Sequence, residues 1–206
     1  MTSPFPPLSE SERRVLLRLA REAVLARVHG APPPDPRVQP SRLGEPQGAF
    51  VTLLLGGELR GCIGTVEPIT PLAETVVRCA AAAATEDPRF PALCAADVLD
   101  LAIEVTLLEP PFEVRDRSQV ILGRHGLLVV RGSRRGVLLP QVAAEHGFDL
   151  PTFIQETLKK AGLPPDALER GGATLMAFEG EVLAEDPRGV TGPAPGSRPR
   201  SPGPTG

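Results

Sequence analysis

The chain has 206 residues, which suits one domain with a sizeable core, and it carries a net charge of −3 with a pI ≈ 5.7. This acidic balance excludes a general nucleic-acid binder, and an aromatic content of 3 % leaves few rings for stacking bases. No apolar run approaches the ~20 residues of a membrane span. The N-terminus lacks the apolar segment of a secretory signal. We therefore expect a cytoplasmic protein with no nucleic-acid or membrane partner.

The cysteine spacing and the absence of cofactor motifs limit the kinds of site that this chain is expected to contain. Cys62, Cys79 and Cys94 are odd in number and widely spaced, which is no disulfide framework and fits a reducing compartment. The sequence contains no CxxC, HExxH, P-loop or strand-linked GxGxxG motif. We therefore expect no cofactor and no metal. A metal site would have to be assembled by the fold, for example from His125, Glu104 and Cys62.

Hydrophobic periodicity and turn signals predict the elements of the first half in chain order. Ser9 and Glu12 form a capping-box pattern in front of an amphipathic helix. Gly56-Gly57 predicts a hairpin turn, which makes the two flanking strands antiparallel. Thr70 and Pro71 are suited to begin the next helix. The expected elements are a helix over 10–28, an irregular connection over 30–48, strands over 49–55 and 58–64, and a helix from about 71 to 84.

The second half of the sequence predicts shorter helices and strands, followed by a C-terminal tail. We expect strands over 101–109, 127–130 and 137–139, helices over 140–145 and 151–161, and a last strand over 173–184 bent at Gly180. Eleven of the 20 residues from 187 to 206 are Pro or Gly, so this segment is expected to be a disordered tail behind a domain over 8–186. Hairpin-linked strands without a βαβ rhythm predict an α+β fold with a mainly antiparallel sheet and flanking helices.

The most informative stretch is the hexapeptide Leu59–Gly64, LRGCIG. In a regular strand, residues i and i+2 share a face, so Arg60 and Cys62 are expected to be neighbours. A guanidinium beside a thiol favours the reactive thiolate. Glycine within a strand often marks a bulge, or a place where a ligand or another backbone comes close. The alternative interpretation is a half-buried strand whose small thiol only fills the core.

Three further features are candidate site residues. His125 lies in the turn Gly123–Gly126, where it is either an acid or base near pH 7 or an exposed turn residue whose side chain bonds the local backbone. Glu104 faces away from the apolar side of its strand and needs a partner if buried, with Arg60 as one candidate. The segment containing Asp87 and Arg89 either supplies a charged pair or merely caps a turn.

Five blocks in register resemble the AMMECR domain family, whose bacterial and archaeal members are called AmmeMemoRadiSam system protein A. They are LRGCIG from Leu59, AATEDPRFP from Ala83, GRHGL from Gly123, LLPQVA from Leu138 and KAGLP from Lys160. The resemblance covers roughly residues 8–186. It implies two lobes around a cleft bearing the hexapeptide, and an association with a Memo-type protein and a radical S-adenosylmethionine protein. The resemblance does not imply a particular reaction, because the family has no established activity. Relatives often have a second cysteine where this chain has Leu158.

Three functions remain open at this point. The first is an accessory or binding subunit whose cleft takes a small molecule or one of the partner proteins of the system, and this is the hypothesis that we favour. The second is an enzyme with Cys62 as nucleophile, activated by Arg60 or using Arg60 to bind an anionic substrate, with His125 and Glu104 as further catalytic candidates. The third is a regulatory or scaffold domain in which the hexapeptide is purely structural.

Overall fold

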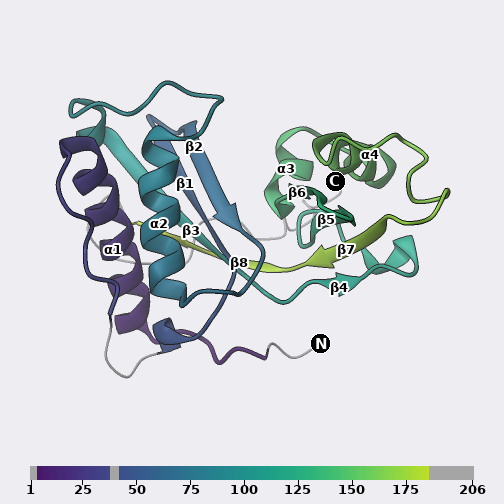
Figure 1. Ribbon diagram of the computed structural model, residues 1–206, viewed down its shortest axis with the longest axis horizontal. Helices are drawn as coiled ribbons and strands as arrows, with labels where there is room; N and C mark the ends of the chain where they lie inside the picture. Colours follow the sequence, from purple (N-terminus) through teal and green to yellow (C-terminus); the bar gives the residue numbers. More distant parts are fainter. Residues whose placement is uncertain (1–3, 38–41, 186–206) are drawn as a thin grey trace, which may run out of the picture.

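The computed structural model describes residues 4–37 and 42–185, which fold into two lobes that each contain an antiparallel sheet and helices (Figure 1). The expected α+β class is thereby confirmed. The helices are α1 (Glu10–His29), α2 (Leu72–Thr85), α3 (Pro140–Glu145) and α4 (Leu150–Lys160). The strands are β1 (Ala49–Leu55), β2 (Glu58–Thr65), β3 (Leu101–Leu108), β4 (Phe112–Glu113), β5 (Gly126–Arg131), β6 (Arg134–Leu138), β7 (Thr174–Phe178) and β8 (Gly180–Ala184).

The first lobe is a four-stranded sheet in the order β2-β1-β3-β8, covered on one face by α1 and α2. The predicted hairpin is present: β1 and β2 are antiparallel and joined at Gly56 and Gly57. Both glycines have positive φ, 59° and 88°, a conformation that residues with a side chain rarely adopt. Alternate residues of the strands, such as Val51 and Val105, are fully buried against the helices, as the alternation predicted.

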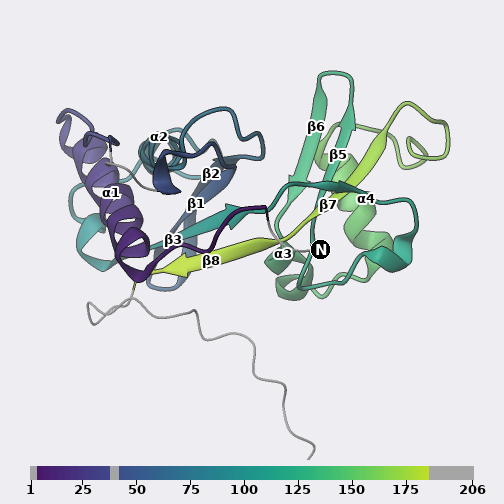
Figure 2. The ribbon, with the colours of Figure 1, turned by 90° about the horizontal axis from the view of Figure 1, so that it is seen from below.

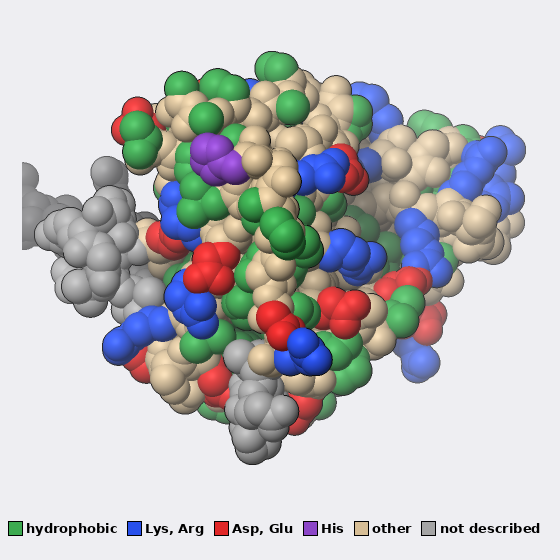
Figure 3. Space-filling model, turned by 60° about the vertical axis from the view of Figure 1, so that its left-hand side comes forward, with side chains coloured by type: hydrophobic (Ala, Val, Ile, Leu, Met, Phe, Trp, Pro, Cys, Tyr) green, Lys and Arg blue, Asp and Glu red, His purple; other side chains and the backbone are tan. Residues whose placement is uncertain are grey.

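Helix α1 begins and ends where its sequence predicted. Ser9 and Glu12 form the reciprocal capping box, and Gly30 closes the helix in the left-handed conformation. Its buried stripe packs on the sheet, while its outer face carries charges paired at i,i+4 spacing, such as Arg14 with Glu10. Figure 3, which brings this side of the molecule forward, shows acidic and basic side chains interspersed over the surface.

The second lobe has the strand order β4-β7-β5-β6, with α3 and α4 packed on it. Asp149 caps α4 by accepting a hydrogen bond from Thr152 N at 2.9 Å. The helix approaches the sheet so closely that a Cβ at Gly136 would lie 2.3 Å from the Thr157 carbonyl oxygen. Leu158, where the family resemblance implied a cysteine in relatives, is fully buried in this core and packs there as an apolar side chain.

The predicted last strand over 173–184 is in fact two strands in different sheets, β7 in the second lobe and β8 in the first. Glu179 separates them and crosses from one lobe to the other. The loop from β3 to β4 crosses back beside it, and Glu109 N donates to the Glu179 carbonyl oxygen at 2.9 Å. Figure 2 shows these two crossings side by side between the lobes. The predicted bend at Gly180 is therefore the point where the chain changes sheets.

A third apolar cluster joins the lobes. Phe50 and Cys62 of the first lobe pack with residues of the second such as Leu128 and Phe178, and the carboxylate of Glu67 pairs with Arg135 across the junction. The expected tail over 187–206 lies outside the described residues. Within the described part of the chain, no helix is both long and apolar enough to serve as a membrane span.

Candidate functional site

Cys62 lies on the sheet face that the helices leave uncovered, which is the face turned toward the second lobe. Thr52 on β1 pairs with Cys62 on one side and with Glu104 of β3 on the other, so the three side chains form a row across the sheet. Thr52 donates its hydroxyl to the Cys62 sulfur at 3.5 Å. Two strand spacings separate the Cα atoms of Cys62 and Glu104 by roughly 10 Å. The strand register therefore builds a small polar row at the lobe junction.

Asp87 anchors the site from the turn that follows α2. Its side chain is only 4 % exposed, and its Oδ2 accepts the Cys62 backbone N–H at 2.8 Å. Arg89 forms a bidentate pair with the same carboxylate, Nε to Oδ1 at 2.9 Å and Nη2 to Oδ2 at 2.7 Å. These bonds from Arg89 and from the Cys62 amide hold the pKa of Asp87 at about 2. A charged pair and a turn cap, posed as alternatives by the sequence, are both present.

The thiol of Cys62 is protonated at neutral pH in this setting. Burial raises its pKa, and this effect outweighs the opposing effects of the Thr52 hydrogen bond and of the positive charges on Arg89 and Lys160. The thiol also packs in the apolar cluster between the lobes. The expected thiolate is therefore not favoured, because the desolvation of the thiol exceeds the attraction of the neighbouring cations.

Arg60 does not act on the thiol, contrary to the sequence-based expectation. The pairing of β1 with β2 is irregular between Leu53 and Leu54, where Leu53 lies opposite Gly61 but Leu54 lies opposite Leu59. Arg60 is the extra residue of this bulge, and the i,i+2 alternation fails there. Its guanidinium instead donates to the carbonyl oxygens of Pro91 and Ala92. The cation beside Cys62 is Arg89, from a segment 27 residues further along the chain.

Glu104 lies half-buried at the far end of the row, and the expected ion pair with Arg60 is not formed. Burial raises the pKa of Glu104, and the negative charge of Glu145 on α3 raises it further. No hydrogen bond or ion pair of the Glu104 carboxylate is seen within residues 4–37 and 42–185. Two carboxylates from opposite lobes therefore approach each other here without a cation between them in the described structure.

His125 belongs to a different part of the molecule. Its Nδ1 accepts the Ile121 N–H at 3.0 Å, its Nε2 lies 3.4 Å from a carboxylate oxygen of Glu179, and its ring meets Phe112 edge-on. These contacts hold His125 at the strand crossing between the lobes. The bond to the local backbone agrees with the second interpretation of the sequence, but the residue is 5 % exposed rather than exposed at the surface. In the described residues, no three His, Cys, Asp or Glu side chains converge as metal ligands, so the trio His125, Glu104 and Cys62 is not assembled.

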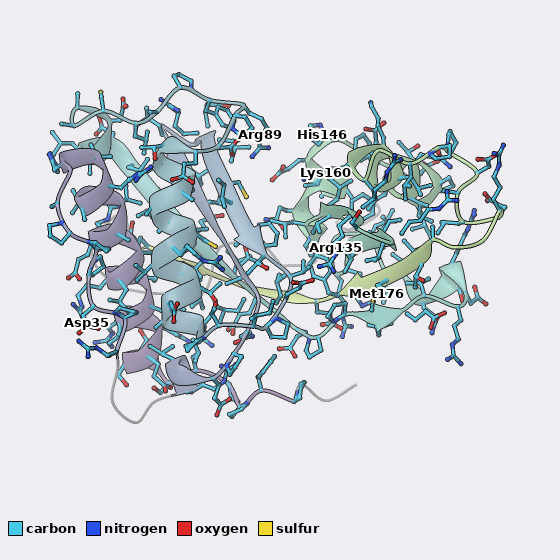
Figure 4. The ribbon with its side chains drawn as sticks, in the orientation of Figure 1. Asp35, Arg89, Arg135, His146, Lys160 and Met176 are labelled. Atoms are coloured by element: carbon cyan, nitrogen blue, oxygen red, sulfur yellow. The ribbon has the colours of Figure 1, made fainter. Side chains whose placement is uncertain are left out.

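Lys160 is a site residue that sequence reasoning missed. It is the last residue of α4, and Figure 4 labels it on the second lobe, across the gap from Arg89. Lys160 is exposed overall, but partial desolvation of its amino group at the junction lowers its pKa, and the positive charge of Arg89 lowers it further, while Cys62 and Asp87 act in the opposite direction. Its signal in the sequence was the block KAGLP, which begins at Lys160, and helical spacing does not indicate that this side chain lies near the other lobe.

The two glycines of the hexapeptide are explained by packing. A Cβ on Gly61 would lie 2.3 Å from the Ala83 carbonyl oxygen of α2, and a Cβ on Gly64 would lie 2.3 Å from the Phe50 ring. No real Cβ is found so close to backbone or ring atoms, so both positions require glycine. The close approach predicted from Gly61 is thus made by another backbone, that of helix α2.

The two sheets, the paired crossings and the Asp87–Arg89 clamp on Cys62 define a two-lobed α+β domain with a polar site at the lobe junction. Comparison with known proteins places the chain in the AMMECR1 family, whose model matches residues 17–183. The chain belongs to this family, as the sequence blocks indicated.

The relatives are of similar length and fold. A protein of Methanothermobacter thermautotrophicus is 40 % identical over 192 residues, covering 88 % of this chain and 98 % of that protein. A protein of Methanopyrus kandleri is 41 % identical over 188 residues, covering 87 % and 91 %. The crystal structure of an uncharacterised protein from Pyrococcus horikoshii superimposes with a TM-score of 0.83 at 35 % identity, covering 91 % of this chain and 98 % of that one.

Proposed function

We propose that the protein is an accessory binding subunit that works with Memo-type and radical S-adenosylmethionine proteins through the junction between its lobes. The observation that carries this proposal is the setting of Cys62. Its side chain is half-buried in the apolar cluster between the lobes, where burial raises the pKa of the thiol, and its backbone amide donates a hydrogen bond to Asp87. A site that holds its central cysteine as a thiol and fixes charged groups around it is suited to recognition rather than to nucleophilic attack.

The enzyme alternative is weakened by the partners of the candidate groups. Arg60 bonds to a loop, His125 lies at the crossing, and the Asp87 carboxylate already accepts four hydrogen bonds. Arg60 is a cation and cannot act as a base, and neither His125 nor Asp87 is placed to take a proton from Cys62. Glu104, the remaining candidate, lies two strand spacings away from Cys62.

A purely structural hexapeptide is the second candidate. It is favoured by Gly61 and Gly64, whose positions packing alone requires. It does not account for Arg89 and Lys160, which bring positive charges toward the same point from opposite lobes.

Co-purification with the two partner proteins tests the proposal. The tagged chain is expected to retain the Memo-type or the radical S-adenosylmethionine protein, and Lys160→Glu should abolish retention because it reverses a charge at the junction. Lys159→Glu is the matched control, since Lys159 is the preceding residue and pairs with Glu156 within α4. Retention of neither partner by the unmodified chain, or equal retention by both variants, would contradict the proposal.

A further inference from the structure

The carboxylate of Asp87 has no capacity left for another cation. Its Oδ1 accepts hydrogen bonds from the backbone N and the Nε of Arg89, and its Oδ2 accepts from Cys62 N and Arg89 Nη2. A carboxylate offers about four lone-pair sites, and all four are taken. The negative charge of the Asp87 carboxylate is therefore compensated by Arg89.

Arg89 keeps one nitrogen unused. Nε bonds to Asp87, and Nη2 bonds to both Asp87 and the Cys62 carbonyl oxygen at 3.4 Å. Nη1 makes no hydrogen bond to any described residue. The Arg89 side chain is 51 % exposed, and its two-point contact with Asp87 fixes the orientation of the guanidinium. The two N–H groups of Nη1 are thus pre-oriented donors at the lobe junction.

Lys160 brings a second unused cation from the other lobe. Within the described part of the chain its ammonium has neither an ion-pair partner nor a hydrogen bond, whereas Lys159 beside it pairs with Glu156. The positive charge of Arg89 lowers the pKa of Lys160, so the two cations repel each other, and the negative charge of Asp87 offsets part of this effect. Neither Glu104 nor Glu145 forms an ion pair with Lys160 within the described residues.

Lys160 has no ion-pair partner of its own. Asp87 pairs with Arg89, and the exposed ammonium of Lys160 pairs with no described residue. Two cations that approach from separate lobes repel each other unless an anion lies between them. An anionic group that accepts hydrogen bonds would lie between the two cations and use both sets of free donors.

We propose that the junction binds a small oxyanion, a carboxylate or phosphate group of a ligand, held between Nη1 of Arg89 on the first lobe and Nζ of Lys160 on the second. The proposal rests on the proposed binding function and names the ligand class of that site. The anion bridges the lobes and lies over the Cys62 segment.

Calorimetric titration of the full chain with inorganic phosphate, and separately with acetate, at constant ionic strength tests this site. Saturable binding of either probe is expected. Lys160→Gln should weaken it at least about tenfold, the loss of one charge-assisted contact, and Lys159→Gln should change it less than about twofold. Arg89→Gln should match Lys160→Gln provided that its melting curve shows a folded chain. Lys160 is exposed, so its variant does not depend on that condition.

The two probes separate the two sources of the anion. Binding of phosphate alone identifies a phosphoryl ligand, and binding of acetate alone identifies a carboxylate. Absence of saturable binding to both, or equal weakening by the two lysine variants, overturns the site. A chain that binds neither probe yet retains its partner proteins overturns only this inference, whereas anion binding without partner retention overturns only the partner proposal.

Discussion

Replacing Asp87 by Asn removes the charge at the centre of the site while preserving its shape. The amide can accept hydrogen bonds through one oxygen only, and its NH₂ group faces the Cys62 N–H and Arg89 Nη2, which are both donors. The buried Cys62 amide thus loses its acceptor. We expect the variant to fold, because side-chain size is unchanged, but with reduced stability.

The magnitude follows from the pKa. A carboxyl whose pKa falls from 3.8 to about 2 on folding contributes up to ~2.4 kcal/mol when ionised. Arg89 is half-exposed, so water screens part of this energy, and we expect Asp87→Asn to cost ~1–2 kcal/mol at pH 7. For a chain of this length that lowers the melting temperature by roughly 2–8 °C.

The dependence on pH has a defined sign. Because the pKa of Asp87 is depressed in the folded state, its contribution is present above a pH of ~4 and is lost as the pH falls toward 2. The stability difference between the unmodified chain and Asp87→Asn should therefore shrink over this window. Urea denaturation at pH 7 and at successive lower pH values measures it.

Asp35→Asn is the control. Asp35 also has a pKa of about 2, from hydrogen bonds with Arg37, but it is exposed, and its replacement should have little effect on stability. An Asp87→Asn cost below ~0.5 kcal/mol, or a difference that stays constant between pH 7 and the acid limit, would refute the reasoning.

Gly61→Ala should destabilise the fold by ~1–3 kcal/mol in urea denaturation, because its Cβ meets the backbone of α2, whereas Gly44→Ala, in open space, should not; equal stabilities would contradict the packing argument. Iodoacetamide should label half-buried Cys62 more slowly at pH 7 than exposed Cys94, as counted by mass spectrometry of the peptides, and faster labelling of Cys62 would revive the enzyme hypothesis. Glu104→Gln should raise the melting temperature at pH 7, since it removes a carboxylate whose pKa burial and Glu145 raise; an unchanged or lower value would point to a stabilising partner of Glu104.

The elements were predictable where the signal was local. The hairpin at Gly56-Gly57, the capped helix α1 and the outward direction of Glu104 follow from turn chemistry and periodicity, and the structure confirms them. The split of residues 173–184 at Glu179 was not predictable, because a strand that changes sheets keeps the same pattern of alternating side chains.

The site was only partly predictable from the sequence. Cys62 lies at the lobe junction, but its cation is Arg89 rather than Arg60, because a bulge breaks the alternation that paired Arg60 with the thiol. Gly61 signals a bulge as one possibility, but which residue is the extra one depends on the partner strand and cannot be read from this strand alone. Lys160 joins the site through tertiary packing of α4, a contact across about 100 residues of chain that no local pattern encodes.

The two crossings form the covalent connection between the lobes, and any rotation of one lobe against the other would occur about them. They lie together at the Glu109–Glu179 hydrogen bond, so a rotation there moves distant points of the lobes more than near ones. Pro110 and Pro111 fix φ in one crossing and stiffen it. The separation of Arg89 and Lys160 therefore depends on these crossings as well as on the apolar cluster that joins the lobes. The stiffness of these crossings sets how much conformational entropy a ligand bridging the lobes must overcome.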